Sequence, residues 1–472
     1  MSPRPASSAV SASVAVVGLI VAMGVVPPAQ AEPCTGAAAT ALPPPTAQEV
    51  PDDSSRGLSG LVPRGHRPSN ANDNAPLPAL GKLIIGAIKS ATVQNQAAVA
   101  PTPNPTTDAK PTKQAPKPAA ATPPVPPAPP GTTVVGWVTG MDAPGNTLQR
   151  FGISGTDLGI MWDNGDPANN QVLMAFGDTY GYCGVEKHQW RYNTLFRSQD
   201  RSLAHSISVA DGSVNDPYSG SPQWRPGLSK EVVRSIKWAP DEQGVIPTAG
   251  ISVGRTQLMN FMSIKSWDSN GRWTTNFSGI AVSNDNGQHW GVYPGTIRTP
   301  TPDSLSQVGY TPGNENFQQG AFLKTGDGYV YSFGTPSGRA GSAYVSRVPQ
   351  SQVPDLTKYQ YWNADNAAWV PANPAAATPV IPGPVGEMSV QYNTYLKQFL
   401  TLYCNTIGDV VMRTAPAPQG PWGPEQMLVS NAQMPGGVYA PYLHPWSTGR
   451  ELYYNLSLWS AYNVMLMHTV LP

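Results

Sequence analysis

The chain has few charged residues and no excess of either sign. Its 472 residues include 29 Lys and Arg against 29 Asp and Glu, and only 12% of the residues are charged. Binding to nucleic acid or to an acidic membrane surface usually rests on a basic excess or a basic patch. The balance therefore gives no electrostatic reason to expect either partner.

Long hydrophobic runs are also missing beyond the N-terminus. Residues 14–26, VAVVGLIVAMGVV, are too few to span a bilayer comfortably, and Arg4 precedes them. Ala29-Gln30-Ala31 then offers small residues at the two positions that a signal peptidase reads. The pattern predicts a signal peptide over residues 1–31, a secreted or cell-envelope protein, and no stable membrane insertion after cleavage. A retained membrane anchor is the alternative interpretation.

Cysteine and histidine are scarce, which limits the disulfide and metal chemistry to consider. Export permits a disulfide between Cys183 and Cys404 that leaves Cys34 unpaired, and the sequence leaves this pairing open. The six histidines show no close ligand spacing, so no zinc site is predicted. Residues 163–170, DNGDPANN, are rich in oxygen ligands but lack the spacing of a calcium loop, and a hairpin tip is the simpler interpretation. We expect no metal and no cofactor.

Proline, by contrast, is abundant, with 52 residues, many of them before residue 131. Residues 32–131 are rich in Pro, Ala and Thr and end in PPVPPAPPG. Such a segment buries too little apolar surface to offset the entropy of ordering it. It is predicted to be a disordered stalk ahead of a folded domain over residues 132–472.

Helical periodicity is scarce in that domain, and residues 229–238 are the best short helix candidate. Apolar runs of four to eight residues recur instead, separated by Gly, Asn, Asp and Pro; examples are QVLMAF, YVYSF and FLTLYC. Several runs alternate apolar and polar residues, which is the period of a strand. An all-β domain of about 340 residues is long for one sandwich, which favours a propeller or a pair of sheets.

One short motif decides between these folds. Residues 283–290, SNDNGQHW, fit the pattern Ser-x-Asp-x-Gly-x-x-Trp and resemble the Asp-box turn of sialidase-like propellers. Short Ser and Asp side chains bond turn amides, Gly adopts a positive φ, and Trp packs the turn onto its blade. At four strands a blade the domain length predicts a five-bladed β-propeller, with the strand near Val134 closing the ring against the strand near Val464.

Two acids stand next to apolar strands that we interpret as strands near the propeller axis. Asp178 follows one in AFGDTY, and Asp157 precedes another in GISGTDLGIMW. Glycosidic bond cleavage needs two carboxyl groups in one place, one to donate a proton and one to activate water or attack the anomeric carbon. The alternative is that each acid only caps a turn amide.

The same stretches resemble the bacterial endo-D-arabinanases of glycoside hydrolase family 183. GTDLGIMW and AFGDTYGYCG are similar to the opening signature of that family, and NENFQQGAF, GEMSVQYN and GGVYAPYLHPWS to later parts, over about residues 133–472. The resemblance implies a five-bladed propeller that cuts within the D-arabinan of actinobacterial arabinogalactan and lipoarabinomannan. It also implies that Asp157 and Asp178 are the two essential aspartates.

Further residues are candidates for contact with a polysaccharide substrate. Glu387 either orients a hydroxyl, supports a catalytic acid or pairs with a structural arginine. Neutral amides suit sugar hydroxyls because each offers a donor and an acceptor, and aromatic rings either stack on furanose rings or belong to the core. The expected substrate-binding residues are Glu387, Asn316, Gln318, Arg339, Trp162, Tyr180, Tyr392, Asn393 and Tyr439.

Two other interpretations compete with the hydrolase. A carbohydrate-binding propeller without catalysis, acting as an envelope lectin or adhesin, needs the same aromatic and amide side chains but not the paired acids. Residues 250–254, GISVG, match the serine hydrolase elbow, but a further strand, RTQLMNFMSI, follows where that elbow requires a helix. We therefore assign no nucleophile to Ser252.

Overall fold

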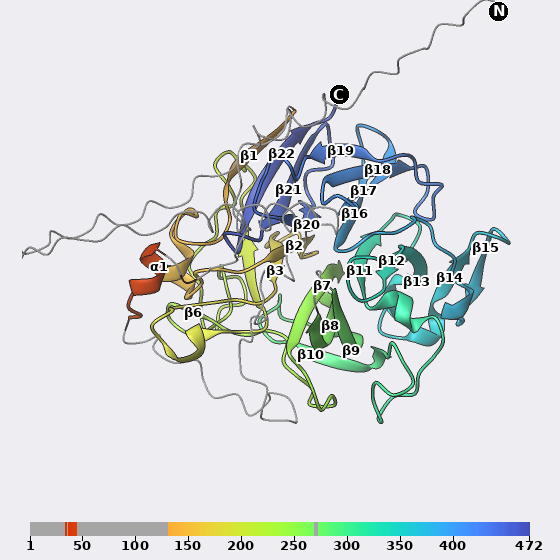
Figure 1. Ribbon diagram of the computed structural model, residues 1–472, viewed down its shortest axis with the longest axis horizontal. Coiled ribbons are helices and arrows are strands. Elements are labelled where there is room, and N and C mark those ends of the chain that lie inside the picture. The colour runs from red at the N-terminus through yellow and green to blue at the C-terminus, as the bar shows by residue number, and fades with distance from the viewer. Residues whose placement is uncertain (1–33, 35, 45–130, 269–271) are drawn as a thin grey trace, which may run out of the picture.

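The computed structural model describes residues 34, 36–44, 131–268 and 272–472. Five antiparallel sheets surround a common axis (Figure 1). Their innermost strands are β2 (Leu158–Asp163), β7 (Gly244–Val253), β11 (Gln319–Lys324), β16 (Met388–Asn393) and β20 (Val438–Leu443). Each of these strands contacts the next, and β20 contacts β2, so the ring is closed. The prediction of an all-β, five-bladed propeller is confirmed.

The blades differ in their number of strands. The first holds β2, β3 (Val172–Phe176) and β4 (Thr194–Ser198), and a small pair, β5 (Gln223–Arg225) and β6 (Leu228–Ser229), follows it. The second adds β8 (Thr256–Asp268), β9 (Arg272–Ser283) and β10 (Gly291–Arg298) to β7. The third adds β12 (Tyr329–Thr335), β13 (Tyr344–Pro349), β14 (Gln360–Asn363) and β15 (Ala368–Pro371) to β11. The fourth adds β17 (Gln398–Cys404), β18 (Val410–Ala415) and β19 (Gln426–Val429) to β16.

The last blade joins the two ends of the domain. It holds β20, β21 (Glu451–Leu458), β22 (Asn463–Val470) and, at its outer edge, β1 (Thr132–Trp137). Val134 pairs with Met467 and Trp137 with Met465 in an antiparallel register. The predicted closure of the ring by the first strand is confirmed, and it hides an edge that would otherwise be free to pair with another chain.

Strand β3 shows why the inner runs are apolar without interruption. Val172, Met174 and Phe176 pack into one hydrophobic cluster, while Leu173 and Ala175 pack into another on the opposite face. Side chains alternate between the two faces of a strand, and here neighbouring blades bury both faces.

The Asp-box turn joins β9 to β10. Ser283 Oγ accepts a hydrogen bond from the Gly287 amide at 2.9 Å, Asp285 Oδ1 accepts one from the His289 amide at 2.9 Å, and Gly287 has a φ of 78°. These predicted features are confirmed. The ring of Trp290, however, lies edge-on to Trp162 of the first blade with 6.5 Å between centroids. The motif therefore connects the second blade to the first. From the sequence we expect Trp290 to pack only against its own blade.

No helix forms over residues 229–238, so that prediction is wrong. Asn193 explains the irregular path: its Oδ1 accepts hydrogen bonds from the Val232 and Val233 amides, and its Nδ2 donates to the carbonyl groups of Val233 and Val245. A buried side chain thus satisfies the backbone groups that a helix would have paired internally.

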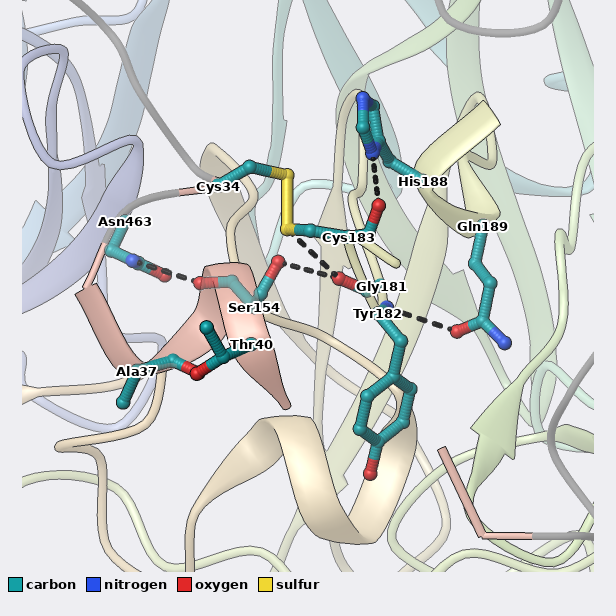
Figure 2. The surroundings of a disulfide bond; sticks show 10 residues. All are labelled: Cys34, Ala37, Thr40, Ser154, Gly181, Tyr182, Cys183, His188, Gln189 and Asn463. Carbon is teal, nitrogen blue, oxygen red and sulfur yellow. Dashed lines mark hydrogen bonds between the residues drawn. A yellow bond between two sulfur atoms is a disulfide. The ribbon is translucent and has the colours of Figure 1, made fainter. Parts of the chain in front are cut away.

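The N-terminal side of the chain is attached to the first blade by a disulfide. Cys34 bonds Cys183, and Cys404 is free, so the Cys183–Cys404 pair that the sequence left open does not form (Figure 2). Cys404 ends β17, where it packs against the hydrophobic cluster of the fourth and fifth blades. A sequence lists cysteines but does not show which of them lie within bonding distance.

Helix α1 (Gly36–Thr40) lies beside the first blade (Figure 1), where Ala38 packs with Leu148 and Tyr182. Leu148 belongs to α3 (Thr147–Phe151). Residues 34 and 36–44 thus contact the propeller although they precede the expected domain boundary at residue 132. The predicted signal peptide, residues 1–31, and most of the predicted stalk, residues 32, 33, 35 and 45–130, lie outside the described residues. No described helix is long and apolar enough to cross a membrane.

Candidate active site

Asp157 and Asp178 come together at the axis, at the end of the ring where β2 begins. Asp157 directly precedes β2. Asp178 follows β3, which is the second strand of its blade and not an innermost strand as the apolar run suggests. The chain reaches the axis because Tyr180 pairs with Gly155 in an antiparallel bridge, which places the segment after β3 beside the segment before β2.

Gly177 permits this close approach. A Cβ atom at this position would lie 2.4 Å from Asp157 Oδ1, and the Gly177 amide donates a hydrogen bond to the Asp157 carbonyl at 3.2 Å. Any larger residue would displace the Asp157 carboxyl group. This steric demand explains why glycine precedes Asp178 in the motif.

A pocket encloses the two acids. Both side chains retain a small exposed fraction, and all five inner strands contribute to the walls or lie next to a residue that does. The walls mix acids, arginines and aromatic rings with apolar side chains. The lining residues are Asp157, Leu158, Asp178, Tyr180, Ile246, Pro247, Thr248, Met262, Trp267, Arg272, Trp273, Gln319, Arg339, Glu387, Tyr442, Trp459 and Tyr462.

Asp157 is held by Tyr439, whose hydroxyl donates to Asp157 Oδ2 at 2.9 Å. Asp157 Oδ1 has no hydrogen-bond partner. Exclusion of water, aided by the negative charge of Glu387, raises the pKa of Asp157 to about 7, while the Tyr439 hydrogen bond and the charge of Arg339 act in the opposite direction. Near neutral pH both protonation states of Asp157 are therefore accessible.

Asp178 has a less favourable environment for a negative charge. Its Oδ1 also lacks a partner. Exclusion of water, followed by the charges of Asp157 and Glu231, raises the pKa of Asp178 well above its usual range. Asp178 is thus the acid that keeps its proton when Asp157 has lost one.

Arg339 and Glu387 form a bidentate ion pair in the pocket wall. Arg339 Nε lies 2.9 Å from Glu387 Oε2, and Arg339 Nη2 lies 2.6 Å from Glu387 Oε1. The guanidinium also lies over the rings of Trp273 and Tyr439, at 4.8 and 5.3 Å from their centroids. The pair joins the wall of the pocket to the tyrosine that holds Asp157. Of the three roles considered for Glu387 from the sequence, the structure therefore supports pairing with an arginine.

Three of the expected substrate-binding residues serve the fold. Gln318 is fully buried, donates to the carbonyls of Arg298 and Asn314, and accepts from Thr275 Oγ1. Asn393 is also fully buried and bonds the Gly449 carbonyl and the Leu396 amide. The Trp162 indole donates to Gln257 Oε1 at 2.9 Å, and its side chain lies in the hydrophobic core and against a second cavity at the other end of the ring. The predictions for Gln318 and Asn393 are wrong because their polar atoms are already bonded within the protein, while stacking of a sugar on Trp162 stays a prediction.

The remaining expected residues divide between the pocket and other places. Tyr180 lines the pocket, whereas Tyr439 lies behind it and holds Asp157. Asn316, in the short helix Asn314–Phe317, does not line the pocket. Tyr392 is 42% exposed and lies on β16 near the other end of the ring, where its ring contacts Phe399.

Several pocket residues escaped the sequence analysis. Gln319, the first residue of β11, lines the pocket, whereas Gln318 ends the preceding short helix with helical backbone angles and is bonded within the protein. Trp267 on β8 pairs with Trp273 on β9. The sequence WDSNGRW, with a tryptophan at each end and the turn-forming residues Asn and Gly between them, is the signal that could have predicted this pairing. Trp459 carries no comparable signal.

The described residues show one cluster with the geometry of a metal site, formed by Cys34, Cys183 and His188, but its two sulfur atoms are bonded to each other. The oxygen-rich residues 163–170 join β2 to β3, so the predicted hairpin tip is confirmed. Asp163 there accepts hydrogen bonds from the Gly165 amide, Asn170 Nδ2 and Trp446 Nε1, which occupies both carboxylate oxygens.

Comparison with known proteins identifies relatives of the chain. A family model described as "Domain of unknown function (DUF4185)" matches residues 142–468. The notoamide biosynthesis cluster protein J' of Aspergillus versicolor is 29% identical over 326 residues, which cover 66% of this chain and 83% of that protein. The notoamide biosynthesis cluster protein J of Aspergillus sp. (strain MF297-2) is 28% identical over 331 residues, which cover 66% of this chain and 82% of that protein.

Solved structures of similar shape include two glycoside hydrolases. A glycosyl hydrolase from Bacteroides ovatus has a TM-score of 0.38 and 10% identity, covering 67% of this chain and 84% of its own. The catalytic domain of the Coprinopsis cinerea GH62 α-L-arabinofuranosidase has a TM-score of 0.37 and 11% identity. The similarity covers 67% of this chain and 91% of that chain. The chemistry of the pocket has to be argued from its own residues.

Proposed function

The chain belongs to the DUF4185 family, and from this premise and the two pocket aspartates we propose that it is a glycoside hydrolase that cleaves internal linkages of D-arabinan. One observation carries the proposal: two aspartates with raised pKa values line a single pocket, and each keeps one carboxyl oxygen without a partner. Structural acids are usually paired, so unpaired acids in a pocket favour a catalytic role.

The environments of the acids suggest a division of roles. Asp178 is the general acid, because burial and the charges of Asp157 and Glu231 disfavour its anion, and it donates its proton to the glycosidic oxygen as the bond to the anomeric carbon breaks. Asp157 acts as an anion, because Tyr439 donates to it and Arg339 lies nearby. It either takes a proton from the water that attacks the anomeric carbon or attacks that carbon itself, and the anomeric configuration of the first product distinguishes these two routes.

The finer assignment to D-arabinan rests on the ordered motifs. Of these, GTDLGIMW and AFGDTYGYCG supply Asp157 and Asp178, and GEMSVQYN supplies Glu387, which also lines the pocket. The substrate is then the D-arabinan of arabinogalactan and lipoarabinomannan in an actinobacterial envelope. The signal pattern over residues 1–31 and the Cys34–Cys183 disulfide support an exported enzyme, because disulfides persist in oxidising compartments.

The test is digestion of arabinogalactan by the full chain, with released oligosaccharides resolved by size. We expect fragments of several D-arabinose units from early times, which is the signature of internal cleavage. Asp157→Asn and Asp178→Asn are each expected to reduce release by about a thousandfold or more, since acid–base groups contribute about 10²- to 10⁴-fold.

Glu242→Gln is the matched control. Glu242 is a buried acid with a raised pKa and an unpartnered oxygen, but it does not line the pocket. We expect it to release fragments like the wild type. Undiminished release by both aspartate variants would refute the catalytic assignment, and absence of D-arabinan fragments would refute the substrate.

A carbohydrate-binding propeller without catalysis is the alternative. It predicts that the wild-type chain retains arabinogalactan on a column and releases nothing. The hydrolase predicts retention by Asp178→Asn and release by the wild type, so the two assays together separate the functions.

The fungal relatives favour a second candidate, a hydrolase of a small molecule. Their names place them in a notoamide biosynthesis cluster. A pocket walled by Leu158, Ile246, Pro247 and Met262 beside aromatic rings also suits a compact, partly apolar substrate. Cleavage of small aryl glycosides with no release from arabinogalactan would favour this candidate.

A further inference from the structure

Three tryptophans that line the pocket have indole N–H groups without a hydrogen-bond partner: Trp267, Trp273 and Trp459. Of the tryptophans elsewhere in the described chain, Trp190 and Trp422 also lack a partner for the indole N–H, whereas three others are bonded within the protein. Trp162 donates to Gln257, Trp290 to the Gly287 carbonyl, and Trp446 to Asp163. An unsatisfied buried donor destabilises the fold, so three in one pocket require an explanation.

The same pocket holds three unpartnered acceptors. They are Asp157 Oδ1, Asp178 Oδ1 and Gln319 Oε1. Gln319 Nε2 donates to the carbonyls of Pro336 and Gly338 at 3.1 and 2.5 Å. The amide is thereby fixed with its oxygen as the group left to accept.

The donors come from two separate blades. Trp267 and Trp273 lie opposite each other on β8 and β9, with 6.0 Å between ring centroids, and Trp459 follows β21 of the last blade. The acceptors come from the first and third blades. A bound ligand would therefore meet donors and acceptors from different sides. All six atoms are inaccessible from the pocket in this conformation, so a ligand reaches them only when side chains of the pocket wall shift.

A hydroxyl group is the chemistry that fits, because it accepts one hydrogen bond and donates another. An apolar ligand would leave all six groups unsatisfied, and a carboxylate ligand would serve the indoles but repel Asp157. Building on the proposed function, we infer that Trp267, Trp273 and Trp459 determine specificity by donating hydrogen bonds from their indole nitrogens to hydroxyl oxygens of the sugar. Their role is then hydrogen bonding and not ring stacking alone.

The inference is tested by exchanging each indole for a ring without a donor. Trp267→Phe, Trp273→Phe and Trp459→Phe keep an aromatic ring, and each is expected to weaken binding of D-arabino-oligosaccharides by about tenfold, the effect of losing one hydrogen bond. Binding is measured in the Asp178→Asn background so that the ligand stays intact. Trp422→Phe is the control, since its indole is equally buried and unpartnered but contacts Phe333 outside the pocket.

Indole N–H resonances of ¹⁵N-tryptophan-labelled protein give a readout that ring packing does not mimic. Saturating ligand is expected to move the three pocket signals downfield in ¹H and to leave the Trp422 signal in place. Wild-type affinity in all three variants, or unmoved pocket signals with any bound sugar, would overturn the inference.

The panel of ligands includes D-arabino-, xylo- and gluco-oligosaccharides, so that this result is separable from the proposed function. A shift with another sugar supports the indole role while it removes the D-arabinan assignment. Cleavage of D-arabinan without a shift removes the indole role and leaves the hydrolase intact.

Discussion

Two cavities, one near each end of the ring, are walled by the same five inner strands but differ in how their polar groups are bonded. The end near Asp157 is the smaller cavity, about 60 Å³, and its acids, indoles and Gln319 keep unpartnered atoms. The other end is larger, about 320 Å³, yet Asp163 and Trp162 there have all their partners within the protein. Thr248 and Tyr442 line both cavities. Unsatisfied bonding, and not size, distinguishes the end near Asp157, which is the end that we propose binds the substrate.

The largest expected difference between the ends concerns charge pairing. Arg339→Leu leaves Glu387 in the pocket wall without its cation, and breaking such a pair costs about 3 to 5 kcal/mol of unfolding free energy. At the other end, Lys324→Met removes an exposed ammonium that donates to the Ser252 carbonyl, and the expected change is within about 0.5 kcal/mol. Urea denaturation measures both. Equal effects would contradict the comparison.

The double variant Arg339→Leu/Glu387→Leu sharpens this prediction. Removal of both charges is expected to recover much of the lost stability, because no uncompensated charge remains. Activity is not expected to return, since the wall next to Tyr439 stays altered.

The next effect concerns the pH profile. Tyr439→Phe removes a hydrogen bond that favours the anion of Asp157, so the pKa of Asp157 rises above its value of about 7 and the acidic limb of the rate profile moves to higher pH. A hydrogen bond to a charged group contributes about 1.5 to 3 kcal/mol, so activity at pH 6 is expected to fall by about tenfold or more and to recover partly at pH 8. Tyr392→Phe, at the other end, is expected to leave the profile unchanged. An unmoved acidic limb in Tyr439→Phe would contradict the role of this tyrosine.

Stability should depend on pH in a manner specific to the acids of the pocket. Asp178 keeps its proton in the folded state at pH values where the unfolded chain has released it, so unfolding releases a proton and wild-type stability falls as pH rises above about 4. Asn does not titrate. Asp178→Asn is therefore expected to have a higher Tm than the wild type at pH 8 and an equal one near pH 3.5, as measured by calorimetry.

Asp163→Asn provides the contrast at the other end. Asp163 accepts from three donors, and the NH₂ group of Asn would face one of them, so a lower Tm is expected at both pH values. A gain in Tm at pH 8 for Asp163→Asn as well would contradict the claim that the pH dependence comes from the acids of the pocket.

The smallest expected effect is at Tyr392. Its ring is exposed and rests on Phe399 at the mouth of the larger cavity. Tyr392→Ala is expected to change the KM for arabinogalactan by less than about twofold, since exposed side chains away from the site contribute little. A larger loss would mean that the polymer also contacts this end.

Local patterns in the sequence predicted the fold well. Alternating apolar runs located most strands, and SNDNGQHW identified the propeller because the turn is built from its own side chains. The helix expected over residues 229–238 failed for the opposite reason, since Asn193, distant in sequence, bonds the amides of Val232 and Val233.

The site was predictable in its acids but not in its walls. Asp157 and Asp178 sit at strand ends, which a pattern reveals, and the structure brings both to one pocket. Gln318 and Gln319 are adjacent amides, and the change from helical backbone at Gln318 to strand β11 at Gln319 decides which one reaches the pocket. Trp459 enters the pocket through the closure of the ring, a long-range contact that no local pattern encodes.

The bond between Cys34 and Cys183 makes residues 34–183 a closed covalent ring, because peptide bonds join the same two residues the other way round. A protease that cuts once between residues 45 and 130 would open this ring without freeing either piece, and two bands would separate on a denaturing gel only after reduction. The bond thus holds Cys34 beside Cys183, on the segment that follows Asp178.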